Sequence, residues 1–238
     1  MADAWIAFAR TGNPSTSSLP WPAYTRAGRL SYKLGQYKRA KDDFTQAEAI
    51  FKHASGKEKT EGKTWAAEAR YYQGELIFKD YQKVTLDVKP SQLNKALTTK
   101  KKLLDEAEKV YLSVVDYNDL KWATASLYRV GQIYDGFAEE LTNAANKPPA
   151  GLSDADKQAY QDAVNEKVVS IQDIAVQAFS TGYTKAIQMQ VYDEYTAKIR
   201  EALGRIAADK FPPEKESRQR ERIGDRPPTP ELISEVAR

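Results

Sequence analysis

The stretch LGQYKRAKDDFTQA, residues 34–47, decides the fold that we expect for this chain. Gly35 is a residue at which a helix commonly ends, and a second helix can begin two residues later. In that second helix Ala40, Phe44 and Ala47 are four and three residues apart, so they lie on one face. A small residue beside a ring on this face lets a neighbouring helix approach closely. The stretch therefore predicts a helical hairpin.

Weaker copies of the pattern recur along the chain. Ala107 and Tyr111 repeat the pair of Ala40 and Phe44 after 67 residues, close to two periods of about 34 residues. This arrangement resembles the tetratricopeptide repeat (TPR), a hairpin that cannot bury its apolar face alone and stacks on copies of itself. The residues that we expect in the repeat core are Gly35, Tyr37, Ala40, Phe44, Ala47, Tyr81, Ala107 and Tyr111.

The pattern of the whole central region is helical. Helices are expected near residues 26–35, 37–55, 63–79, 91–117, 120–143, 153–188 and 192–209. Only residues 83–88, rich in β-branched side chains, are ambiguous, and Pro90 closes that segment. The expected fold is all-α, with TPR-like antiparallel hairpins stacked as a short solenoid over residues 26–211.

The two ends differ from this region. DAWIAFARTGNP and LPWPAY, within residues 3–24, resemble the segment near the C-terminus of type B carboxylesterases. We therefore treat residues 1–25 as a carboxylesterase-like fragment, which in that family follows the catalytic residues. Residues 212–238 combine mixed charges with prolines, and a disordered tail is expected there.

A narrower resemblance covers the central and C-terminal parts. The runs YYQGELIFKDYQKVTLD, EAEKVYLSVVDYNDLKWATASLYRVGQIYDGFAEEL and VYDEYTAKIREALGRI, followed by FPPEKE, are similar to TPR proteins of myxobacteria. The similarity covers about residues 65–216, and the TPR-like region as a whole covers about 26–216. Some of those proteins are associated with adventurous gliding motility and the cell envelope. The resemblance implies a bacterial scaffold of such an assembly.

Composition excludes several classes of function. The 36 basic and 33 acidic residues are well mixed, so no concentrated basic face for nucleic acid or an anionic membrane is expected. There is no cysteine, which removes thiolate catalysis and cysteine-ligated zinc. No signal peptide or transmembrane run is found, and the default expectation is the cytoplasm. The periplasm or envelope applies if the chain is a section of a longer exported protein.

Catalytic and metal sites have little support. His53 is the only histidine, and no Gly-x-Ser-x-Gly elbow accompanies it. The acidic clusters lack the spacing of an EF-hand, and no phosphate-binding glycine loop occurs. The lysine run at residues 100–102 is expected to form a solvated helix face. We therefore expect no enzyme activity, no cofactor and no metal.

The tyrosines leave two alternatives open. Tyr71 and Tyr128 either pack between helices or line an inner groove that grips a peptide. The candidate partner-binding residues are Arg70, Tyr71, Gln73, Tyr128, Arg129 and Gln132. The function expected from the sequence is a scaffold that binds another protein or peptide, with self-association as a further possibility. The alternative is a remnant of a carboxylesterase that lacks its catalytic core.

Overall fold

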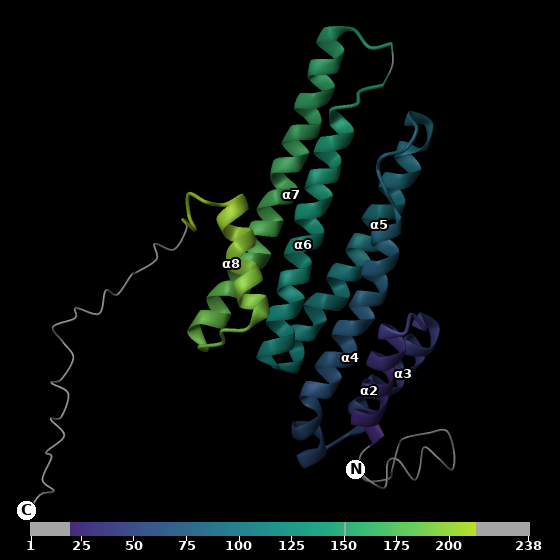
Figure 1. Cartoon of the computed structure of the whole chain (residues 1–238), viewed down its shortest axis with the longest axis vertical. Coiled ribbons are helices and arrows are strands. Elements are labelled where there is room, and N and C mark those ends of the chain that lie inside the picture. Colours follow the sequence, from purple (N-terminus) through teal and green to yellow (C-terminus); the bar gives the residue numbers. More distant parts are fainter. Residues whose placement is uncertain (1–19, 150, 213–238) are drawn as a thin grey trace, which may run out of the picture.

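The structure is a computed structural model that describes residues 20–149 and 151–212 (Figure 1). Within these two ranges the regular elements are all helical, which confirms the expected all-α class. The helices are α2 (Pro20–Lys33), α3 (Tyr37–His53), α4 (Gly56–Lys83), α5 (Pro90–Val114), α6 (Leu120–Ala145), α7 (Asp154–Gln188) and α8 (Glu194–Ile206), and a 3₁₀ turn, η1 (Val115–Tyr117), follows α5. Most of the expected carboxylesterase-like fragment and all but the first residue of the expected tail lie outside the described residues.

Local signals explain where several helices begin and end. α2 ends where Gly35 adopts a φ of +74°, a left-handed conformation that favours glycine. The Asp119 side chain caps the start of α6 by accepting a hydrogen bond from the Trp122 amide. The Ser153 side chain caps the start of α7 by accepting one from the Asp156 amide. α2 begins at Pro20 and thus runs through the boundary expected near residue 25. The ambiguous segment before Pro90 is an irregular loop.

The helices form three antiparallel hairpins, α2/α3, α4/α5 and α6/α7, and α8 follows the last of them (Figure 1). The first helices of the hairpins pack on one another in the order α2, α4, α6, and α8 continues this series; we call these four helices the inner row. α3, α5 and α7 form the outer row. Each outer helix packs on its own partner and on the next inner helix, but in the described ranges the outer helices do not pack extensively on one another. The inner row therefore forms the continuous layer of the fold.

One contact recurs in each hairpin, and it sets the distance between the two helices. A ring of the outer helix lies directly over a glycine of the inner helix, so that a methyl group added to the glycine would clash. The pairs and the resulting Cβ-to-ring distances are Gly28 with Phe44 (2.6 Å), Gly74 with Tyr111 (2.6 Å) and Gly131 with Phe179 (2.5 Å). The three rings are fully buried. Close packing of this kind requires a residue without a side chain under the ring.

The residues around each ring are also repeated. A fully buried alanine precedes the ring by four residues, and a small or β-branched buried residue follows it by three. The three sets are Ala40, Phe44 and Ala47; Ala107, Tyr111 and Val114; and Ala175, Phe179 and Gly182. The sequence pattern does not predict the third set, because the number of residues between the glycine and the ring increases from one hairpin to the next. The ring follows its glycine by 16, 37 and 48 residues in the three hairpins.

Lys100 corrects the expectation of a solvated lysine run. Lys101 and Lys102 are exposed, but the Lys100 side chain is 1% exposed. Its ammonium donates to the Val84 carbonyl at 2.5 Å, pairs with Glu140 at 2.8 Å and lies 4.1 Å from the centre of the Tyr81 ring. Consecutive residues of a helix point about 100° apart, so one lysine of the three faces inward.

Gly131 and Gly136 provide a matched pair of substitutions within α6. Gly131→Ala should lower the free energy of unfolding by about 1–3 kcal/mol, because its methyl group would overlap the Phe179 ring. A methyl group added to Gly136 would meet no atom within 4 Å apart from its chain neighbours and the backbone of its own helix, so Gly136→Ala should raise the stability by about 0.5–1 kcal/mol. Urea unfolding followed by circular dichroism measures both changes. Equal effects of the two substitutions would contradict the ring-over-glycine contact.

Candidate functional site

The inner row is joined at each of its three junctions by an arginine and a carboxylate. The pairs are Arg29–Glu68 between α2 and α4, Glu75–Arg129 between α4 and α6, and Asp135–Arg205 between α6 and α8. In each pair the carboxylate is the more buried partner. Planar guanidinium groups suit this position, because they can hold a buried carboxylate while their other edge reaches solvent.

The central pair is the most completely bonded of the three. Arg129 binds Glu75 with two parallel bonds, Nε to Oε1 at 2.6 Å and Nη2 to Oε2 at 2.9 Å. The Tyr111 hydroxyl donates to the same Oε1 at 2.7 Å, and Arg129 also donates to the Gln132 amide oxygen. The Glu75 side chain is 8% exposed. These bonds satisfy a carboxylate that would otherwise be costly to bury.

The pKa values around Glu75 follow from burial and from its negative charge. Burial raises the pKa of Tyr111 well above its ordinary value, and the neighbouring Glu75 carboxylate raises it further. Burial lowers the pKa of Arg129, but hydrogen bonds and attraction to Glu75 outweigh this and raise it overall. Tyr111 therefore stays a neutral donor and Arg129 stays charged.

Tyr71 lies in the core. Its side chain is 3% exposed, and its ring centre lies 5.7 Å from that of Tyr111 and 5.0 Å from that of Trp122. Tyr128, from α6, is half-buried, and its ring centre lies 6.0 Å from the ring centre of Tyr195 of α8. Tyr195 also lies 6.5 Å from Tyr71. The structure thus brings the two predicted tyrosines to a third one on α8, but only Tyr128 and Tyr195 are partly accessible.

The four predicted polar residues fall into two groups. Arg129 and Gln132 belong to the Glu75 network on the inner row. Arg70 instead donates to Ser113 of α5 at 2.7 Å and to Gln73, and Gln73 donates to Glu48 of α3 at 3.1 Å. Arg70 and Gln73 therefore join α4 to the outer row. The six candidate residues do not form one continuous surface.

Most of the expected repeat core is buried. Phe44 and Tyr111 cover their glycines, and Tyr81 is buried with its hydroxyl donating to the Ile133 carbonyl. The buried members are Ala40, Phe44, Ala47, Tyr81, Ala107 and Tyr111. Gly35 is exposed in the turn after α2, and Tyr37 is 38% exposed at the start of α3.

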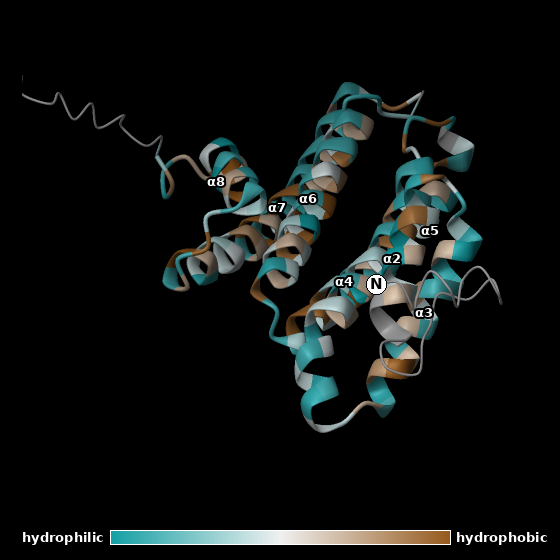
Figure 2. Ribbon diagram, turned by 60° about the horizontal axis from the view of Figure 1, so that its bottom comes forward, coloured by the Kyte–Doolittle hydropathy of each residue, from teal (hydrophilic) through white to brown (hydrophobic). Residues whose placement is uncertain are grey.

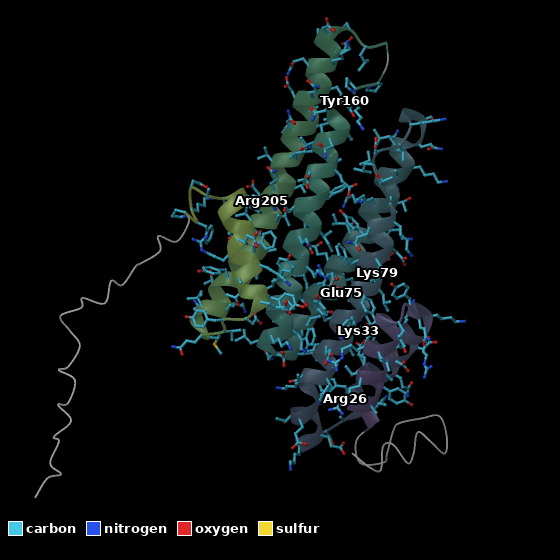
Figure 3. All side chains as sticks on the ribbon, in the orientation of Figure 1. Arg26, Lys33, Glu75, Lys79, Tyr160 and Arg205 are labelled. Carbon is cyan, nitrogen blue, oxygen red and sulfur yellow. The ribbon has the colours of Figure 1, made fainter. Side chains whose placement is uncertain are left out.

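Tyr37 belongs to a group that sequence reasoning did not recognise. The Lys79 ammonium lies 5.4 Å from the centre of the Tyr32 ring and 5.2 Å from that of Tyr37, and the two ring centres are 5.6 Å apart. We call these three residues the tyrosine–lysine corner. Lys79 is one helical turn after Glu75, so it shares the face of α4 that carries the Glu75–Arg129 pair (Figure 3). Local spacing gives no signal for the contact with Tyr32 and Tyr37, because these residues belong to other helices.

A second lysine and tyrosine lie together on α8. The Lys198 ammonium is 5.2 Å from the centre of the Tyr195 ring, and it also pairs with Glu194 at 2.9 Å. Two accessible lysine–tyrosine pairs therefore come from different inner helices. A cation over an aromatic ring retains its charge and presents a flat apolar surface beside it.

The described residues contain no group of three His, Cys, Asp or Glu side chains placed to hold a metal ion. In the same ranges no helix has both the length and the apolar character needed to cross a bilayer. His53 lies exposed at the end of α3. The polar side chains described above bind one another.

Comparisons of the chain with models of protein families, with curated proteins and with solved structures find no match. The function proposed below therefore rests on the sequence patterns and on the contacts between residues of this chain. These contacts include the arginine–carboxylate pairs along the inner row.

Removal of Glu75 tests the central network. Glu75→Ala leaves the Arg129 charge and the Tyr111 hydroxyl without their shared acceptor, and should cost about 3–5 kcal/mol of unfolding free energy. Asp105→Ala removes an exposed partner of Lys101 and should change stability by no more than about 0.5 kcal/mol. Urea titration of both variants provides the comparison. A cost for Glu75→Ala as small as that for Asp105→Ala would show that the network does not stabilise the fold.

Glu68 and Glu48 should respond to pH in opposite directions. Burial raises the pKa of Glu68 despite the nearby Arg29, so its stabilising contribution is present at low pH and is lost as pH rises through its folded pKa. Burial also acts on Glu48, but bonds to Lys52 and attraction to Arg70 lower its pKa overall. The contribution of Glu48 is therefore lost as pH falls.

The measurement is urea unfolding of two glutamine variants at pH 4 and pH 7.5. Relative to the unmodified chain, Glu68→Gln should gain stability between pH 4 and pH 7.5, and Glu48→Gln should lose stability over the same interval. The same sign for both variants would refute this assignment of the two environments.

Proposed function

We propose that this protein is a non-catalytic scaffold of TPR-like hairpins, and that it binds a segment of another protein along its inner row. The observation that carries this proposal is the repeated ring-over-glycine contact, which gives three hairpins of different length one common packing. Arrays of such hairpins place their first helices side by side and form an extended surface. The inner row is such a surface.

The TPR-like assignment is supported by the residues around each contact. Glycine in the first helix, alanine one turn before the ring and a small residue three positions after it occur together in α2/α3, where only 16 residues separate glycine and ring. The later hairpins keep the glycine and the alanine, have Val114 or Gly182 three positions after the ring, and extend both helices beyond these residues. We therefore treat the ring-over-glycine contact and the residues around it as the repeated unit, and the additional helical turns as extensions of that unit.

The accessible groups suggest the chemistry of the bound segment. Glu68 and Glu75 are buried against arginines, whereas Lys79 and Lys198 lie over tyrosine rings at the accessible side of the inner helices. A segment with acidic and apolar side chains would pair its carboxylates with the lysines and place its apolar groups on the rings. Affinity would gain from the preformed surface, because the bonded inner row needs little further ordering.

The setting of the scaffold rests on resemblance alone. A role in a bacterial envelope or gliding-motility assembly is the setting that the similar myxobacterial proteins suggest. The carboxylesterase alternative depends on residues 4–24, of which only Pro20–Tyr24 are described, and these belong to α2. No contact of the described residues favours that alternative.

Charge reversal at Lys79 tests the binding face. Lys79→Glu in the full chain should abolish capture of the protein retained by the unmodified chain from lysate and envelope fractions, because it removes the cation of the tyrosine–lysine corner. Lys102→Glu makes the same change of charge at an exposed position on α5 and should retain the protein. Circular dichroism should show equal helicity in all three chains.

Two results would contradict the proposal. Retention of every captured protein by Lys79→Glu would exclude this corner from binding. Equal loss with Lys79→Glu and Lys102→Glu would show capture through net charge and not through the inner row.

A further inference from the structure

α8 differs from the other inner helices because no outer helix is paired with it. α2, α4 and α6 are each succeeded by an outer helix that packs back on them, namely α3, α5 and α7. α8 continues the series, since it packs on α6 and Arg205 pairs with Asp135. Ile199 of α8 also packs against α7, where it would lie 3.0 Å from a methyl group added to Gly182. In the described part of the chain no helix comes after α8. Beside α8 there is a groove that no described helix covers.

This groove lies between the end of α7 and the side of α8, with a volume of about 740 Å³. Its lining combines the apolar or aromatic side chains of Tyr183, Ile187, Tyr192 and Ala197 with the charged side chains of Asp193, Arg200 and Glu201. Tyr192 is 73% exposed, and Met189, in the same turn, is also largely exposed. Figure 2 shows hydrophobic residues where α7 ends beside α8. Apolar side chains gathered at one groove indicate a surface that another element covers.

The chain after α8 is held at the edge of this groove. The Phe211 ring lies edge-on against Tyr183, with ring centres 6.2 Å apart. Arg200, which lines the groove, donates to the Phe211 carbonyl at 3.2 Å and to the Pro212 carbonyl. The described chain therefore ends at the groove, and residues 213–238 continue from that point.

The sequence of these last residues contains one segment suited to the groove. Residues 214–226 are mostly charged, and Ile223 is their only apolar residue of any size. Thr229-Pro230-Glu231 then provides a helix start signal, with a capping residue, a proline at the first helical position and an acidic first turn. The apolar residues beyond it share one helical face, and the polar residues share the other. The apolar set is Leu232, Ile233, Val236 and Ala237.

We propose that residues 230–238, within the stretch whose composition predicts disorder, fold as a short helix when they dock in the groove between α7 and α8. Nine helical residues span about 13 Å, shorter than α8 itself. Residues 213–229 provide a tether whose average reach is about 20–25 Å. The apolar face would contact Tyr183, Ile187 and Tyr192. This proposal is independent of the binding proposed for the inner row.

Thiol labelling offers a direct test, because the chain has no cysteine of its own. Ala197 is exposed and lines the groove, so A197C places a single thiol where the segment would cover it. The labelling rate is then compared in three full-length A197C chains: without further change, with Leu232→Asp and Ile233→Asp together, and with Ser234→Asp. Ser234→Asp adds a charge to the opposite helical face and is the matched control.

Labelling should be about tenfold slower in the A197C chain and in its Ser234→Asp derivative than in the Leu232→Asp/Ile233→Asp derivative. Ile187→Asp, on the groove itself, should raise the rate to the same extent with the segment unaltered. A chain that instead carries K102C on α5 should label at one rate with all the tail variants, which shows that they leave the rest of the fold intact.

Equal labelling of A197C in every chain would overturn the proposal, because the groove would then be open throughout. Protection that disappears on dilution and accompanies a doubled mass in sedimentation would also overturn it, by assigning the groove to the segment of a second copy. Protection that is independent of concentration supports the intramolecular helix.

Discussion

The hydrogen bond from Tyr111 to Glu75 holds together the middle of the molecule. The Tyr111 ring covers Gly74, and its hydroxyl reaches the carboxylate of the next residue, which in turn binds Arg129. Tyr111 of α5 is thus fixed to α4 by close packing over Gly74. Through its hydrogen bond to Glu75 it is also connected to α6, because Glu75 forms an ion pair with Arg129. The two effects depend on each other. Without the close approach over Gly74 the hydroxyl could not reach Glu75, and without that hydroxyl the buried carboxylate would lose a donor.

The first and third hairpins, α2/α3 and α6/α7, have a simpler form of the ring-over-glycine contact. Phe44 and Phe179 have no hydroxyl group, so they require no acceptor beneath the ring. The buried carboxylate Glu68 is instead held by Arg29 from the neighbouring inner helix, and Asp135 is bound by Arg205. Packing within a hairpin and bonding between hairpins are therefore separate at the two ends and combined at the centre. Loss of a residue at the centre should disturb both.

The sequence was sufficient for the helices but not for the contacts between them. Helical periodicity, Gly35 and the capping residues are local signals, and they place the described helices within a few residues at most ends. α4 is the main exception, because its polar first two turns carry no apolar pattern. The arginine–carboxylate pairs join residues 39, 54 and 70 positions apart, and no local spacing indicates such pairs. The Phe179 contact was hidden for a related reason, since a fixed period cannot detect hairpins that lengthen.

The lengthened hairpins also explain why the inner row is fixed at more than one level. Figure 1 shows α4/α5 and α6/α7 extending well beyond α2/α3. In that extension Lys100 binds Glu140 and the Val84 carbonyl, and Lys147 binds Asp87 at 2.7 Å, so the loop after α4 is attached to α6 and to the segment that follows it. Beyond the Glu75–Arg129 pair, α6 is thus also joined, through Lys100 of α5, to the loop that follows α4. Two separated attachments resist rotation of one helix against the other, which a single ion pair cannot do. The accessible side of these helices is consequently ordered by contacts within the chain itself.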